Sequence, residues 1–190
     1  MSKSEQNIEL LYSIMKKYSR YPEDYEEIRE NCAKKLFSKS QNGTTYGMFF
    51  PFSEMKEHFI YRGKIVGERA KYDNEYCFDE SGRLLATKFV YYDVKGYEYV
   101  FYFYGESNVD YVRINSHYEV KGCGRYETEN GKLLRLIECR CVFESGKISE
   151  IAEYVFGIKR GCVIFNKYYT GISGMQDVVQ TNVFSRLFGA

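Results

Sequence analysis

The sequence predicts an α+β fold in which two N-terminal helices pack on a large antiparallel β-meander. Two observations carry this prediction. Apolar residues recur at helical spacing within residues 1–40, whereas aromatic and β-branched residues dominate from residue 46 onward. A turn signature centred on glycine also recurs between the strand-like segments. A sheet of this many strands tends to curl or split, so partial closure into a barrel is part of the prediction.

The helical part is expected to contain two helices. Residues 5–20 carry an apolar stripe at helical spacing, formed by Ile8, Leu11, Met15 and Tyr18. A second helix is expected to begin at Pro22, which suits the first helical position. Its stripe consists of Tyr25, Ile28, Cys32 and Leu36. The polar stretch 38–45 then separates a helical segment over 1–40 from a β body over 46–190, and the two together form one structural domain.

The β body is expected to consist of short strands rich in aromatic and β-branched residues. These strands cover residues 46–52, 57–62, 65–78, 83–93, 97–104, 109–120, 123–128, 132–143, 147–157 and 161–169. The segment 175–188 fits two periods, because its valines favour a strand while Val179, Val183 and Leu187 also fit a helical stripe. Helix and strand both remain open for this segment.

The turn signature is an aromatic residue, a short polar stretch, glycine, a basic or bulky residue and often Leu or Ile. Its glycines are Gly63, Gly82, Gly96, Gly131 and Gly146. The copy Phe78–Leu84 resembles the Tyr-Asp-x-x-Gly-Arg-Leu core of YD (RHS-type) repeats, and the copy 92–96 matches it in part. The Gly-Lys-Leu/Ile copies resemble variant MORN-type hairpins of some bacterial antitoxin-like proteins. These resemblances imply β-hairpin architecture and a role in protein binding or toxin biology.

Composition excludes several classes of partner. The 190 residues include 20 tyrosines, and the net charge is +1 at pH 7. Nucleic-acid binding is not expected, because it requires a clustered positive surface. A secretory signal and an apolar run of transmembrane length are both missing from the sequence, which predicts a cytoplasmic protein without a membrane partner.

One group of acidic residues stands out between positions 23 and 30. It consists of Glu23, Asp24, Glu26, Glu27 and Glu30. The favoured interpretation is a helix start whose carboxylates complement the macrodipole. The alternative is a surface that mimics nucleic acid or docks a basic partner.

The six cysteines are expected to be reduced and buried as small hydrophobic side chains. Cys139 and Cys141 lie about 6.6–6.8 Å apart on one predicted strand, which strains a disulfide. A zinc site built from these two residues with Cys123 and Cys162 would need favourable strand pairing. No nucleotide-binding, metalloprotease or serine-hydrolase motif occurs, so the sequence predicts no cofactor, no metal and no catalytic residue.

The segment 109–120 carries the most suggestive strand face. Its first face is the expected core, formed by Val112, Ile114, Tyr118 and Val120. The opposite face is a row of side chains that can all form hydrogen bonds: Tyr111, Arg113, Asn115, His117 and Glu119. We predict that these five residues form a recognition surface.

Three hypotheses for function follow. The first is a non-enzymatic binding protein with a protein partner, and an immunity or antitoxin-like protein is one version of it. The second is a β-barrel that binds a small apolar ligand, suggested by the aromatic residues on both faces of 97–104. The third is an enzyme in which His117 is a general base oriented by Glu119, with Arg113 holding an anion.

Overall fold

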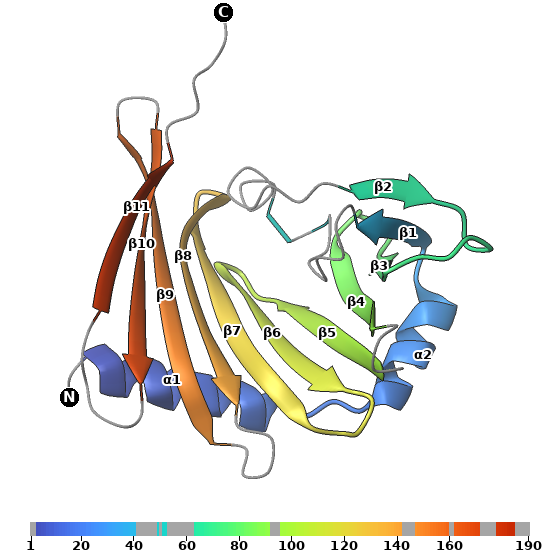
Figure 1. Ribbon diagram of the computed structural model, residues 1–190, viewed down its shortest axis with the longest axis horizontal. Coiled ribbons are helices and arrows are strands. Elements are labelled where there is room, and N and C mark those ends of the chain that lie inside the picture. Colours follow the sequence, from blue (N-terminus) through green and yellow to red (C-terminus); the bar gives the residue numbers. More distant parts are fainter. Residues whose placement is uncertain are drawn as a thin grey trace, which may run out of the picture. The chain divides into compact units, whose positions relative to one another are not determined.

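The computed structural model describes residues 3–40, 49, 51–52, 63–91, 96–141, 147–159, 162–171 and 178–184. Within these residues, helices α1 (Lys3–Lys17) and α2 (Pro22–Asn31) precede a series of β-strands (Figure 1). The strands are β1 (Lys34–Ser40), β2 (Gly63–Val66), β3 (Asn74–Phe78), β4 (Leu84–Tyr91), β5 (Gly96–Tyr104), β6 (Asn108–Asn115), β7 (Val120–Glu129), β8 (Lys132–Cys141), β9 (Ile148–Lys159), β10 (Cys162–Gly171) and β11 (Val178–Phe184). The predicted α+β class is confirmed.

The strands follow one another in a meander. Their hydrogen-bonded order is β11-β10-β9-β8-β7-β6-β5-β4-β3-β1-β2. Chain neighbours therefore pair throughout, except that β1 lies between β3 and β2. The order is linear, with β11 and β2 as its end strands, so the pairing among the described strands does not close a barrel.

The chain divides into two compact units. Unit 1 consists of residues 1–17, 104–110 and 122–190, and unit 2 consists of residues 18–103 and 111–121. Helix α1 therefore belongs to unit 1 and α2 to unit 2, so each unit has a helix of its own.

Helix α2 is shorter than predicted. It ends at Asn31, and the backbone of Cys32 is extended after its N–H donates to the carbonyl of Ile28 at 2.8 Å. The following residues form β1, in which Leu36 pairs with Tyr76 of β3. The prediction that Leu36 lies on the helix is therefore wrong, because pairing with β3 outweighs the helical spacing of that side chain.

Two other strand predictions change in detail. The predicted strand 65–78 is interrupted, since β2 ends at Val66 and β3 begins at Asn74. The segment left open at 175–188 contains a strand, β11. The predicted strand 57–62 and most of 46–52 lie outside the described residues.

Two copies of the glycine turn signature form hairpin turns within the described residues. Gly82, between β3 and β4, has φ 82°, and Gly131, between β7 and β8, has φ 76°. In the first turn the Asp79 carboxylate accepts hydrogen bonds from the Ser81 hydroxyl at 2.7 Å and from the backbone of Arg83 at 2.8 Å. These bonds lower the pKa of Asp79 to about 2. Both glycines therefore have the positive φ that the turn signature predicts.

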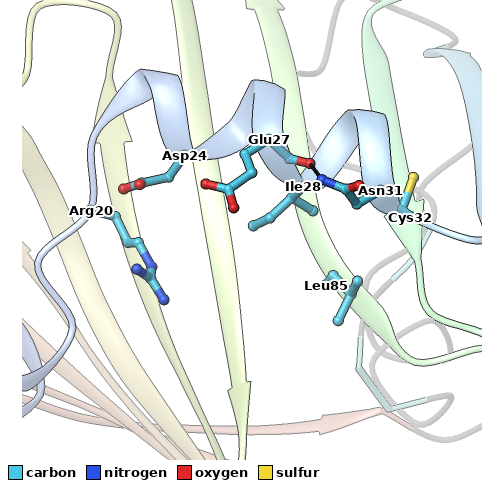
Figure 2. A pocket seen from close by; sticks show the side chains of 7 residues that line it. All are labelled: Arg20, Asp24, Glu27, Ile28, Asn31, Cys32 and Leu85. Carbon is cyan, nitrogen blue, oxygen red and sulfur yellow. Dashed lines mark hydrogen bonds between the residues drawn. The ribbon is translucent and has the colours of Figure 1, made fainter.

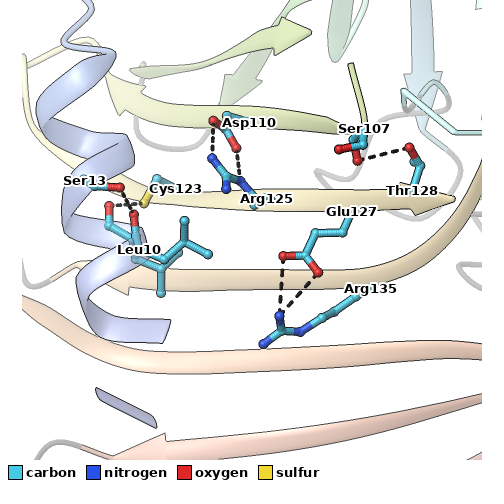
Figure 3. Close-up of polar contacts among 10 residues, drawn as sticks. Leu10, Ser13, Ser107, Asp110, Cys123, Arg125, Glu127, Thr128 and Arg135 are labelled. Carbon is cyan, nitrogen blue, oxygen red and sulfur yellow. Dashed lines mark hydrogen bonds and ion pairs between the residues drawn. The ribbon is translucent and has the colours of Figure 1, made fainter. Parts of the chain in front are cut away.

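In unit 1, α1 lies against strands β7 and β8. Leu11 and Ile14 of the helix are buried, and the Cys123 thiol of β7 donates to the carbonyl of Leu11 at 3.3 Å (Figure 3). Arg135 of β8 donates to the side chain of Asn7 at 2.8 Å. The helix is thus fixed by apolar burial and by polar contacts at two points.

In unit 2, α2 lies against strands β3, β4 and β5. Tyr25 is fully buried, its ring centroid is 5.1 Å from that of Tyr99, and the Cys77 thiol points at its hydroxyl at 3.7 Å. Burial raises the pKa of Cys77 to about 12, so this thiol stays protonated. One turn further along, Arg29 binds the buried carboxylate of Glu75 at 2.5 Å.

Candidate functional site

The polar row predicted on 109–120 does not lie on one strand. Strand β6 ends at Asn115, and the chain turns before β7 begins at Val120. The side-chain oxygen of Asn115 accepts the backbone N–H groups of His117 and Glu119, each at 3.0 Å, and its amide donates to the Glu119 carboxylate at 2.6 Å. The prediction of a continuous strand is wrong because Asn115 closes a turn with its own side chain.

The five predicted residues therefore separate into two groups. Tyr111, Arg113 and Asn115 alternate along β6, as expected for one face. Tyr111 is buried, with its ring centroid 6.3 Å from that of Tyr102. Arg113 donates to the buried carboxylate of Glu98 at 2.7 Å, so this group contributes mainly to packing within unit 2.

His117 and Glu119 lie in the turn itself. His117 is exposed, and the carboxylate of Glu119 is held by Asn115. No hydrogen bond between the His117 and Glu119 side chains occurs in this described turn, so Glu119 does not orient the imidazole. The turn geometry instead determines the position of the residue between them, Tyr118.

Tyr118 was predicted to lie in the core, and this prediction is wrong. Its side chain is 58% exposed and its backbone has φ 66°, a left-handed conformation that is uncommon for a bulky residue. Its hydroxyl donates to the carboxylate of Glu23 at the start of α2, and its ring lies 6.4 Å from that of Tyr21. The same hydrogen bond lowers the pKa of Glu23 and raises the pKa of Tyr118.

A second group of aromatic residues lies beside the next turn of α2. The Lys88 ammonium of β4 is 4.4 Å from the ring centroid of Tyr97, 5.7 Å from that of Tyr99 and 3.5 Å from the Glu26 carboxylate. Tyr97 is 40% exposed, whereas Tyr99 is buried. Burial, with Glu26 as the next cause, raises the pKa of Tyr99 to about 12. We call Tyr21, Glu23, Glu26, Lys88, Tyr97 and Tyr118 the tyrosine patch.

The other flank of α2 borders a pocket of about 280 Å³ (Figure 2). Its lining residues are Arg20, Asp24, Glu27, Ile28, Asn31, Cys32 and Leu85. The guanidinium of Arg20 lies 5.1 Å from the ring centroid of Phe103. The pocket therefore combines one cation, two carboxylates and an apolar floor of Ile28 and Leu85.

Helical geometry explains how α2 contributes side chains both to the tyrosine patch and to the pocket. At 100° per residue, Tyr25 and Arg29 share the inner face that contacts the sheet. The same spacing turns Glu23 and Glu26 toward the tyrosine patch and Asp24 toward the pocket, with Glu27 at the outer crest. The acidic group found in the sequence is thus an exposed ridge.

The sequence pattern pointed to α2 but missed the tyrosines beside it. Residues 117–119 fit the alternation of a strand, and this alternation hides the turn. The available signal was Asn115 followed by Ser116, two residues that favour turns. The contact of Tyr118 with Glu23 spans 95 residues and leaves no local pattern.

Other classes of site find no support in the described parts of the chain. No group of three or more His, Cys, Asp or Glu side chains there could hold a metal ion. Neither described helix has the length and apolar character needed to span a bilayer. In comparisons with protein-family models, with curated proteins and with solved structures, no match to this chain was found.

Proposed function

We propose that this chain is a non-enzymatic protein-binding domain whose recognition element is α2 with the tyrosine patch, and that its partner is a basic protein. The observation that carries the proposal is the placement of exposed Tyr21 and Tyr118 at the start of an acidic helix. Tyrosine is enriched in protein interfaces, where its large ring contributes contact area and its hydroxyl finds a polar partner.

The patch is held in place before any partner arrives. Tyr118 is fixed by its hydrogen bond to Glu23, and Tyr97 by Lys88 over its ring face. The Asn115 turn fixes the backbone that presents Tyr118. Side chains that are already ordered lose little conformational entropy on binding, which favours affinity.

The charge of α2 supports a basic partner. The helix carries five carboxylates, and its one guanidinium, Arg29, already binds Glu75 and Glu68. Within the described residues, the carboxylates of Glu27 and Glu30 have no hydrogen-bond or ion-pair partner. Opposite charges across an interface guide association and select the partner. The pocket between Asp24, Glu27 and Arg20 has room for a lysine or arginine side chain of that partner.

An immunity or antitoxin-like protein is the specific version that we favour. Such a protein acts by covering a surface of its target and needs no catalytic residue. The resemblance of the glycine turns to hairpins of antitoxin-like proteins points in the same direction, and a cytoplasmic location suits this role.

Affinity capture with matched variants tests the proposal. The full chain is used as bait in lysate of its own source cells, in wild-type form, as Tyr21→Ala/Tyr118→Ala and as Tyr12→Ala. Tyr12 is 43% exposed on α1 and serves as a matched exposed tyrosine outside the patch. We expect a stoichiometric basic partner with wild type and Tyr12→Ala, and its loss with the double variant. Recovery of no such partner, or equal recovery by all three baits, would contradict the proposal.

A small-molecule role is the second candidate, and the pocket beside α2 supports it. Its three charged groups favour a zwitterionic or cationic ligand with an apolar part over the purely apolar ligand expected from the sequence. A thermal-shift screen of amines and amino acids tests this role. Stabilisation of wild type that is lost in Asp24→Asn/Glu27→Gln supports it, and no stabilisation by any compound contradicts it.

A further inference from the structure

We propose that Cys123 and Cys139 are a modification site, a dithiol that a disulfide oxidant converts into a cross-strand disulfide beneath α1. The two Sγ atoms are 3.6 Å apart, so the side chains already point at each other. Both residues are buried, at 0% and 4% exposure, and neither is part of a disulfide.

The strand register explains why these two cysteines form the pair. Cys123 of β7 and Cys139 of β8 are direct partners in the antiparallel ladder. Directly opposed residues have Cα atoms about 4.5–5.5 Å apart, which lies within the range of about 4.4–6.8 Å that a disulfide requires. Cys139 and Cys141, two residues apart on one strand, are separated by about 6.6–6.8 Å and would strain the bond.

The neighbouring glycine brings the two backbones unusually close. A Cβ atom added to Gly122 would lie 2.2 Å from the carbonyl oxygen of Cys139, a contact that only glycine allows. This close approach occurs at the residue directly before Cys123 in β7. Formation of the bond then requires side-chain rotation and little movement of the strands.

The chemistry is an ordinary thiol–disulfide exchange with oxidised glutathione as the oxidant. The thiolate of one cysteine attacks oxidised glutathione, forms a mixed disulfide and releases one reduced glutathione. The thiolate of the second cysteine then attacks the protein sulfur of the mixed disulfide and releases the second. In total, two S–H bonds are lost, one S–S bond forms, and two electrons reduce the oxidant to two thiols.

The position of α1 couples this reaction to the packing of unit 1. The Cys123 thiol lies beside α1 (Figure 3) and donates its hydrogen to the carbonyl of Leu11, which is fully buried. The oxidant can reach the sulfur only when α1 moves away from β7. The disulfide in turn removes the hydrogen bond to Leu11, so the oxidised form holds the helix less firmly.

Peptide mapping of the full chain tests the site. Protein is equilibrated across a series of glutathione redox mixtures, quenched in acid, alkylated and digested. We expect a peptide pair joined through Cys123 and Cys139, with the loss of two hydrogens in the intact mass. The cross-link should vanish in Cys139→Ala and in Cys139→Ser, and it should persist in Cys32→Ala, which changes a cysteine of unit 2. Free alkylated thiols at both positions in the most oxidising mixture, or a bond between Cys139 and Cys141, would overturn the proposal.

Hydrogen exchange of the wild-type chain tests the coupling and needs no variant. We expect backbone amides of α1 to exchange at least several-fold faster in the oxidised protein, while amides of α2 keep their rates as an internal control. Unchanged protection of α1 in protein that carries the disulfide would refute the link between the thiols and the helix.

Discussion

Helices α1 and α2 both cover a face of β-sheet in their own unit, but they differ in what they expose. Helix α1 balances Glu5 and Glu9 with lysines, and its inner face is fixed by Leu11 and Asn7. Helix α2 uses Tyr25 and Arg29 for the same purpose and carries five carboxylates, of which four are exposed. The exposed charges of α1 include both signs, whereas the exposed charges of α2 are all negative.

The interiors of the two units are more alike than their helices. In unit 1, Arg125 binds the buried Asp110 through two hydrogen bonds of 2.6 and 2.9 Å (Figure 3). In unit 2, Arg113 binds the buried Glu98. Each unit thus satisfies buried carboxylates with partly exposed arginines, which removes the cost of an unpaired charge. The two units therefore treat buried charge alike, and their helices differ at the surface.

The largest expected effect concerns the buried ion pair of unit 1. Arg125→Ala leaves the Asp110 carboxylate buried without its cation and should destabilise the chain by about 3–5 kcal/mol. Urea unfolding followed by circular dichroism measures the change. Arg140→Ala is the control, because Arg140 is 67% exposed and 3.9 Å from Glu150, and should cost about 0–1 kcal/mol. Similar decreases in the free energy of unfolding of both variants would mean that the burial of Asp110 does not determine the destabilisation.

The next effect concerns the charge that distinguishes the two helices. Glu27→Lys reverses an exposed carboxylate on α2 and should weaken binding of the captured partner roughly tenfold, about 1.4 kcal/mol. Glu9→Lys makes the same change on α1 and should leave binding unaltered. Titration calorimetry at two salt concentrations measures both, and the difference should shrink in high salt. Equal weakening by the two variants would break the functional distinction between the helices.

A smaller effect should be shared by the two units. Gly82→Ala in unit 2 and Gly131→Ala in unit 1 each place a side chain at positive φ in open space. Backbone strain alone should then cost about 1 kcal/mol in each case. Thermal unfolding of both variants measures it. A cost confined to one glycine would show that the two turns differ in something besides backbone conformation.

The smallest effect is the pH dependence of the turn at Asp79. Because hydrogen bonds lower the folded-state pKa of Asp79 to about 2, its contribution to stability is complete above the ordinary carboxyl pKa near 4. The contribution is lost as the pH falls toward 2. Wild type should therefore lose stability more steeply over this interval than Asp79→Asn, as measured by urea unfolding at each pH. Parallel curves would contradict the assignment.

The sequence predicted the elements whose structure depends mainly on residues close to one another in the chain. Alternation placed most of the described strands, and the turns at Gly82 and Gly131 separate β3 from β4 and β7 from β8 as predicted. The residues after Asn31 were misassigned because Leu36 continues a helical stripe, and only the pairing with Tyr76 of β3 makes this segment a strand.

Of the candidate site, the sequence indicated only the acidic part, and only as the alternative interpretation of that cluster. The carboxylates of α2 are adjacent in the chain and visible as a cluster. Tyr118 reaches Glu23 because Asn115 closes a turn, and Cys123 meets Cys139 because β7 and β8 have one particular register. Both contacts depend on how the folded chain pairs and turns, so neither could be predicted from the order of residues alone.

Gly122 also bears on how the β7–β8 hairpin avoids pairing errors while it folds. A slip of one residue would turn every side chain to the wrong face, so the competing alternatives are slips of two. In one direction Val120 would take the place of Gly122 and collide with the carbonyl of Cys139. In the other direction Arg125 would take the buried position of Cys123 and lose Asp110. Gly122 and Arg125 thus each disfavour one of the two nearest alternative registers of the β7–β8 hairpin.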